Sequence, residues 1–135
     1  MIIQNRIMKK TASILLFLCV VSFSLFAQNK KNDSIVFTYL TYDYGTIEVG
    51  SPGKCEFKFT NKKETPLVLS KVRAACGCTT PEWPKDPIFP GKTGIITVKY
   101  NTNSIGQFNK TITVNSNAVN SNVVLRIRGN VVKSK

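Results

Sequence analysis

Histidine is missing from all 135 residues of the sequence. Its absence excludes Ser-His-Asp and Cys-His catalytic arrangements, because both need an imidazole as the general base. It also excludes every histidine-ligated metal or haem site. The length allows one domain, since compact domains typically contain about 100–150 residues. Because no general base, nucleophile pair or phosphate-binding loop can be assembled from the residues present, we expect no enzyme, no catalytic residue and no cofactor.

Acidic residues are also scarce, with 7 Asp and Glu against 19 Lys and Arg and a formal charge of +12. An excess of this size raises the question of nucleic-acid binding. The lysines, however, are spread over turns and outward strand positions, without the interleaved aromatic residues on which single strands stack. We therefore expect no nucleic-acid partner. Two explanations of the positive charge are equally good: it keeps the protein soluble, or it attracts anionic lipid or polysaccharide.

No apolar run is long enough for a membrane span, which needs about 20 residues. The longest, residues 14–26, contains Ser22 and Ser24. Three basic residues precede it, and Ala27 and a polar stretch follow it. This order is typical of a secretory signal peptide, so we expect cleavage after Ala27 and no stable membrane span in the remaining chain.

Removing the signal peptide, residues 1–27, changes the composition of the chain. That segment holds three of the 19 basic residues and none of the acidic ones, so the formal charge falls to +9. It also holds both methionines and one of the four cysteines. We expect a short polar lead at 28–34, one domain at 35–132 and a tail at 133–135. The mature protein is expected in the periplasm or secreted to the cell surface, with an unknown protein or cell-envelope component as its partner.

Helical periodicity of useful length is absent, and short β-branched and aromatic runs separated by Gly, Pro, Asn and Asp take its place. In residues 54–60, for example, Cys55, Phe57 and Phe59 alternate with polar residues, as in a half-buried strand. The predicted strands are 35–40, 42–47, 54–60, 66–73, 94–100, 108–115 and 123–132. About seven such strands favour an all-β fold, a single antiparallel immunoglobulin-like β-sandwich, with a small closed barrel as the alternative.

A proline-rich passage interrupts the strands, with Pro81, Pro84, Pro87 and Pro90 spaced three apart. Proline donates no backbone hydrogen bond and is excluded from central strands. We therefore predict an irregular crossover here.

The one motif that could carry chemistry is Cys76-Gly77-Cys78. Its two thiols could form a small-ring disulfide, which Gly77 would ease by adopting backbone angles closed to other residues. They could hold a soft metal ion such as Cu(I) or Zn, or they could be inert structural thiols. A metal would need further ligands, and Cys55 is a possible third one. Export favours disulfides, and with three cysteines the pairing among Cys76, Cys78 and Cys55 stays open.

Four further side chains carry predictions. Cys55 alternates with core phenylalanines, which favours a buried thiol that behaves as a small apolar residue. Trp83 is a candidate for partner or ligand contact, although capping one end of the core is the simpler interpretation. Glu82 and Asp86 are interpreted as solvated loop charges, because a domain of this size has little room for a carboxylate-lined cleft.

The cysteine-tryptophan passage, VRAACGCTTPEWP at residues 72–84, resembles the signature of a bacterial family, domain of unknown function 1573. YDYG at 42–45, IFPG at 88–91, FNKTI at 108–112 and VLRIRG at 124–129 are similar to other parts of its pattern. The resemblance implies an exported, immunoglobulin-like domain similar to the abnormal-spindle and Hydin group. It brings no established activity with it. Cys55 departs from the family's pattern, which weakens any scheme that needs a third thiol.

Two classes of function follow from these observations. The first is an exported, non-catalytic binding or structural module. The second is a thiol-based role, metal binding or redox exchange, at Cys76 and Cys78.

Overall fold

Eight β-strands make up residues 33–135, the part of the chain that the computed structural model describes. The expected signal peptide, residues 1–27, lies outside these residues. In chain order the strands are β1 (Ile35–Phe37), β2 (Thr41–Glu48), β3 (Lys54–Asn61), β4 (Leu69–Ala74), β5 (Thr79–Glu82), β6 (Thr93–Tyr100), β7 (Gly106–Ser116) and β8 (Asn122–Val132).

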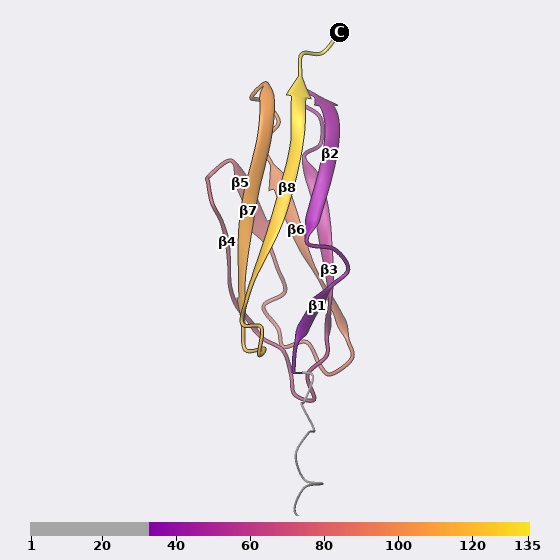
Figure 1. Cartoon of the computed structure of the whole chain (residues 1–135), viewed down its shortest axis with the longest axis vertical. Helices are drawn as coiled ribbons and strands as arrows, with labels where there is room; N and C mark the ends of the chain where they lie inside the picture. The colour runs from indigo at the N-terminus through magenta and orange to yellow at the C-terminus, as the bar shows by residue number, and fades with distance from the viewer. Residues whose placement is uncertain (1–32) are drawn as a thin grey trace, which may run out of the picture. The chain divides into compact units, whose positions relative to one another are not determined.

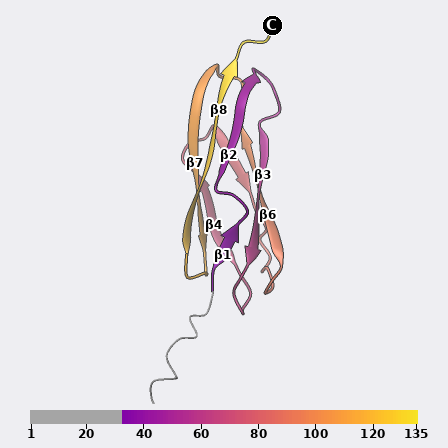
Figure 2. The ribbon, with the colours of Figure 1, turned by 45° about the vertical axis from the view of Figure 1, so that its right-hand side comes forward.

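The strands form two four-stranded sheets that pack face to face. Sheet A has the order β1-β3-β6-β5, and sheet B has the order β2-β8-β7-β4. Sheet B lies toward the viewer in Figure 1, and the rotated view of Figure 2 shows the two layers. This arrangement confirms the predicted immunoglobulin-like sandwich. No helix that could span a membrane occurs in residues 33–135.

One neighbouring pair, β2 and β8, is parallel, whereas the prediction was an antiparallel sandwich. The cause is the way the chain changes sheets after β1. The Thr38 N–H still donates to Lys58 of sheet A (3.0 Å), and the carbonyl of Leu40 already accepts from Arg126 of sheet B (2.8 Å). The chain crosses within two residues and continues into β2, which thus runs in the direction of β8.

The proline-rich passage is more ordered than the predicted crossover, because its first part is β5. β5 pairs antiparallel with β6 alone, and Pro81 lies opposite Val98. As an edge strand, β5 needs hydrogen bonds on one side only, and an edge tolerates proline. The exclusion of proline from central strands was correct, but it did not exclude an edge strand.

The core lies between the sheets and is filled by alternate residues of the strands. Phe57 and Phe59 of β3 are fully buried, as their alternation predicts. The other fully buried apolar side chains include Leu67, Ile96, Val98, Ile112, Leu125, Ile127 and Val131. At roughly 25 cal/mol per Å² of apolar surface, this burial is the main contribution to folding.

Asn61 is a buried polar residue at the end of β3, with no exposed surface. Its Nδ2 donates to the carbonyls of Thr65 (2.9 Å) and Ile88 (2.8 Å), and its Oδ1 accepts from the Lys63 N–H (2.8 Å). A buried amide is tolerated only when it is hydrogen-bonded. Asn61 therefore holds together the turn after β3 and the segment before β6.

Candidate functional site

The Cys76-Gly77-Cys78 motif lies in the turn that leads from β4 in sheet B to β5 in sheet A. Backbone hydrogen bonds attach this turn to both sheets. The Ala75 N–H donates to the Thr111 carbonyl of β7 (3.0 Å), and the Asn101 N–H donates to the Cys78 carbonyl (2.9 Å). Asn101 directly follows β6 of sheet A. The turn therefore connects the two layers at one edge of the sandwich.

Within this turn, a disulfide joins Cys76 and Cys78, whose Cα atoms are 5.3 Å apart. Both cysteines are half-buried. The Thr79 hydroxyl, on the first residue of β5, lies 3.8 Å from the Cys76 Sγ and 3.7 Å from the Cys78 Sγ. Of the pairings that the sequence left open, the structure contains this one.

Gly77 does not have the role that the sequence suggested. Its φ angle is not positive, unlike those of Gly45, Gly50, Gly91 and Gly106. A Cβ atom added to Gly77 would meet no heavy atom within 4 Å. The expectation that Gly77 eases the disulfide ring by adopting backbone angles closed to other residues is therefore wrong for this turn.

Cys55 is separate from the disulfide. It lies on β3 opposite Val98, is 5% exposed and has no disulfide partner. Burial raises the pKa of its thiol, and the neighbouring Tyr44 side chain opposes part of that shift. Among residues 33–135, no three His, Cys, Asp or Glu side chains lie close enough together to hold a metal ion. In the described residues, Cys55 is therefore not a third ligand beside Cys76 and Cys78.

Trp83 follows β5 and packs partly against the core. The Lys85 Nζ lies 3.0 Å from the centroid of its ring, so an ammonium covers one face of the indole. The buried Nε1 has no hydrogen-bond partner among the described residues. Trp83 thus resembles a cap on the core more than an open stacking platform.

The two carboxylates of this passage lie apart from any cleft. Glu82 ends β5, where its Oε1 lies 3.0 Å from the Lys99 Nζ, and Asp86 is exposed. Glu82 is therefore a strand residue with a cationic neighbour, whereas the sequence interpretation placed it in a loop. Both side chains are exposed, as expected.

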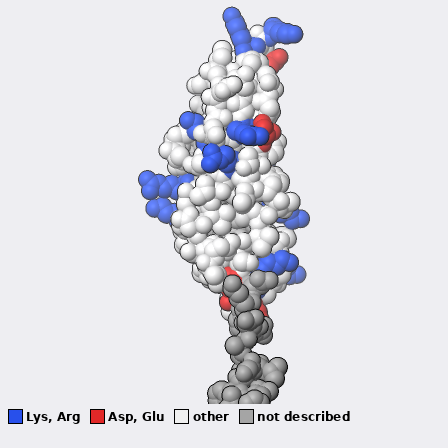
Figure 3. Space-filling view, viewed as in Figure 1, with Lys and Arg blue, Asp and Glu red and all other residues white. Residues whose placement is uncertain are grey.

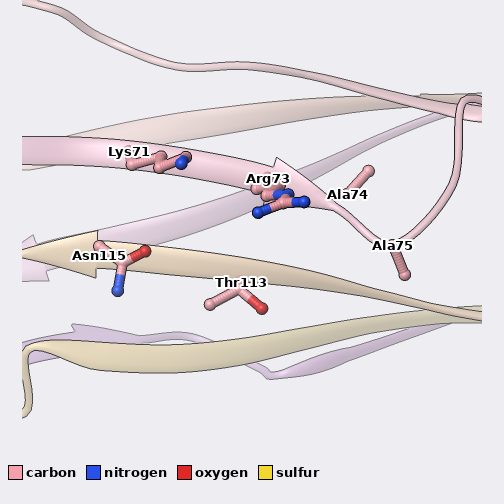
Figure 4. A pocket seen from close by; sticks show the side chains of 6 residues that line it. All are labelled: Lys71, Arg73, Ala74, Ala75, Thr113 and Asn115. Carbon is pink, nitrogen blue, oxygen red and sulfur yellow. The ribbon is translucent and has the colours of Figure 1, made fainter.

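A shallow hollow of about 360 Å³ lies beside the disulfide turn, on the outer side of β4 and β7. Figure 4 shows Lys71 and Arg73 along β4, with Thr113 and Asn115 beside them on β7. Ala74 and Ala75 complete the lining, where β4 leads into the turn. The register places Arg73 opposite Thr113 and Lys71 opposite Asn115. We call these six residues the β4–β7 hollow.

The hollow was not predicted from the sequence, in which the basic residues are dispersed along the chain. A signal was nevertheless present in the alternation of β4, where Leu69 and Val72 are buried and Lys71 and Arg73 are exposed. The pairing of β4 with β7 was not visible in the sequence. That pairing brings two cations of one strand beside a hydroxyl and an amide of another.

Comparisons with known proteins agree with this architecture. The family profile described as "Protein of unknown function (DUF1573)" matches residues 35–131. No curated protein matches the sequence.

Solved structures show the same fold at low sequence identity. A protein of unknown function from Porphyromonas gingivalis W83 has a TM-score of 0.63 and 15% identity, over 78% of this chain and 51% of that one. This chain thus spans about half of that protein. The ASH/PapD-like domain 7 of human CEP192 has a TM-score of 0.66 and 6% identity, over 82% and 93% of the two chains. The VesB protease of Vibrio cholerae has a TM-score of 0.61 and 12% identity, over 71% and 31%. These identities show a shared fold and no shared activity.

Proposed function

The chain belongs to the DUF1573 family, and we propose that it is an exported, non-catalytic binding module for a component of the bacterial cell envelope. Its contact surface is the β4–β7 hollow. The observation that carries the proposal is the position of this hollow beside a turn that is closed by a disulfide and attached to both sheets by two backbone hydrogen bonds. Pre-organised surfaces bind well because little conformational freedom is lost on association.

The chemistry of the hollow supports recognition of a polar ligand. Lys71 and Arg73 supply cationic donors, and the Thr113 hydroxyl and the Asn115 amide can both donate and accept hydrogen bonds. The hollow is too shallow to enclose a reacting molecule and exclude water from it, which catalysis usually requires. A binding role suits this surface better than an enzymatic one.

Export is supported by the amino-terminal pattern and by the disulfide. The basic start, the short apolar run and the polar shift after Ala27 are typical of a secretory signal. A disulfide such as Cys76–Cys78 persists in oxidising compartments and is rare in the reducing cytosol. The envelope is thus where this protein would meet its ligand.

The test is co-sedimentation of the mature protein with isolated envelope fragments, using a variant that fills the hollow. Thr113→Tyr adds a bulky uncharged side chain between β4 and β7, and Thr97→Tyr on sheet A is the matched control. We expect retention of the wild type and of Thr97→Tyr, and loss of most retention for Thr113→Tyr. The proposal fails if the wild type is not retained or if both variants behave alike.

A second function is favoured by the partial exposure of the disulfide. A dithiol substrate could attack one sulfur of Cys76–Cys78, form a mixed disulfide and leave as an oxidised disulfide, while Cys76 and Cys78 become two thiols. In the reduced state the same pair could hold a soft metal ion. Thiol titration, analysis of bound metal and a dithiol-oxidation assay test this role. The variant Cys76→Ser with Cys78→Ser would abolish activity if the role is real and leave it unchanged if it is not.

A further inference from the structure

The outer faces of the two sheets differ in how their charges are arranged. On sheet A, two of the three outward lysines have acidic neighbours: Lys54 lies 3.3 Å from Glu56, and Lys99 lies 3.0 Å from Glu82. The third, Lys58 of β3, is exposed. Exposed ion pairs of this kind add little stability, but they leave a face with little net charge.

The outer face of sheet B, in contrast, is mainly cationic. Alternation along the strands leaves Lys71 and Arg73 of β4 and Arg126 and Arg128 of β8 exposed. We call these four residues the basic face. Figure 3, viewed from the side of sheet B as in Figure 1, shows blue side chains from the middle of the molecule to its left edge and few red ones between them.

Two carboxylates lie on this side, both on the edge strand β2. The Oδ2 of Asp43 lies 2.8 Å from the Arg128 Nε, and Asp43 also accepts from the Gly45 N–H (2.8 Å). Glu48 lies at the far end of β2, opposite Val132, where it accepts from the Ser134 hydroxyl. Lys71, Arg73 and Arg126 thus outnumber the acidic groups near them, so the face attracts anions.

The spacing of the basic face suits a ligand with several anionic groups. Successive outward residues of one strand are about 7 Å apart, and β4 and β8 are separated by about 10 Å because β7 lies between them. The four cations therefore span an area larger than one small anion. A polymer that carries a charge on each repeat could contact them together.

The side chains that lie between the cations indicate which uncharged groups of the ligand this face can bind. On β7 they are Asn109, Thr111, Thr113 and Asn115, a row of amides and hydroxyls that runs between β4 and β8. One of them, Asn109, already accepts from the Arg126 Nη1 (3.0 Å). Such groups hydrogen-bond to the hydroxyls of sugars. They do not supply the apolar insertion that a membrane surface favours or the aromatic stacking that bound nucleotides need.

We propose that the basic face of sheet B binds an anionic polysaccharide, one whose sugars carry carboxylate or phosphate groups. This inference rests on the proposed binding function and names the class of its ligand. The guanidinium groups bind the anionic substituents, because the planar fork of arginine matches carboxylate and phosphate oxygens. The row of amides and hydroxyls on β7 and the β4–β7 hollow accommodate the sugar hydroxyls.

The test measures binding of the mature, disulfide-containing protein to immobilised polygalacturonate, which carries carboxylates, and to phosphorylated dextran, with uncharged dextran as the blank. The test variant combines Arg73→Glu with Arg126→Glu. Its matched control combines Lys58→Glu on β3 with Lys92→Glu before β6, which changes the net charge equally. Thermal unfolding of both variants verifies that they fold.

We expect binding to at least one of the anionic polymers, with affinity about tenfold lower when NaCl rises from about 50 to 300 mM. The sheet B variant should bind at least about tenfold more weakly, and the control should change less than about threefold. The polymer that binds more tightly identifies the anionic group.

Equal losses in the two variants would overturn the proposal, since they would indicate attraction to net charge. Tighter binding to phosphatidylglycerol vesicles or to a single-stranded oligonucleotide would also overturn it. If neither polysaccharide binds while Thr113→Tyr still lowers retention by envelope fragments, this inference fails and the proposed binding function stands. If retention is also unaffected, both fail.

Discussion

At the scale of single residues, Cys55 illustrates how burial decides what a cysteine can do. Its thiol lies on the inner side of β3 beside Tyr44, whose hydroxyl donates to the Gly53 carbonyl (2.7 Å). Burial raises the pKa of both groups, because an ionised sulfur or oxygen loses its hydration there. Cys55 is therefore a protonated, unreactive part of the core. The half-exposed Cys76 and Cys78 are the sulfur atoms that solutes can approach.

The raised pKa of Cys55 predicts a loss of stability at alkaline pH. In the unfolded chain the thiol ionises near pH 8.5, and in the folded protein it ionises at higher pH. The folded state thus keeps a proton that the unfolded state releases, so its stabilisation is complete below about pH 8 and decreases as pH rises. The contribution of one such group approaches about 1.4 kcal/mol per pH unit.

Urea denaturation between pH 7 and 10 measures this effect. The free energy of unfolding of the wild type should fall above pH 8, and that of Cys55→Ala should fall less steeply. Val98→Ala, at the position opposite Cys55, is the control, because it removes core volume without removing the thiol. Equal slopes in the wild type and Cys55→Ala would contradict the assignment.

At the scale of secondary-structure elements, the contact between β3 and β6 shows how closely the strands are matched. Gly94 of β6 lies opposite Phe59 of β3, whose ring is fully buried. A Cβ atom at Gly94 would lie 2.3 Å from the Phe59 Cζ. The absence of a side chain at Gly94 therefore makes room for the aromatic ring.

Gly94→Ala should destabilise the protein by about 1–3 kcal/mol, because the ring must move within a packed core. Gly77→Ala is the matched comparison and should change stability by less than about 0.5 kcal/mol, since its turn has open space and an ordinary φ. Chemical denaturation measures both changes. A large loss for Gly77→Ala, or none for Gly94→Ala, would show that the packing of these two sites is misassigned.

Some elements could be predicted from the sequence and others could not, for a common physical reason. The strands around Phe57 and Ile127 were recognised because alternation with period two is a local property. The parallel pairing of β2 with β8 depends on where the chain changes sheets, and the edge position of β5 depends on its partner β6. Strand pairing joins segments that are distant in the sequence, so a local residue pattern does not reveal it.

At the scale of the whole molecule, the distribution of charge between the two sheet faces matters more for binding than the net charge of the chain does. The sequence reports a charge of +12, but it does not show that the acidic residues of β3 and β5 lie beside lysines of sheet A. Sheet B keeps its arginines with fewer acidic neighbours. A module with one cationic face and one balanced face can bind an anionic surface in a defined orientation.

The signal-peptide pattern of residues 1–27 predicts that the whole protein is exported. When the full chain is expressed in a bacterium with a general secretion system, we expect it in the periplasmic or extracellular fraction with Gln28 as its first residue. Fractionation followed by intact-mass measurement tests this. Replacing Leu16 by Arg interrupts the apolar run and should leave the uncleaved chain in the cytoplasm. An uncleaved wild-type chain would contradict the prediction.

The sequence by itself determined the fold class, the alternating core residues of strands such as β3, and the cysteine motif at 76–78, because each of these is a pattern of neighbouring residues. Only the tertiary structure decided that the motif closes as a disulfide within the turn between β4 and β5, that Cys55 lies apart from it, and that Lys71 and Arg73 meet the polar row of β7. A strand pattern fixes which side chains point outward. Pairing in the sheet decides which of those side chains become neighbours, and recognition depends on neighbours.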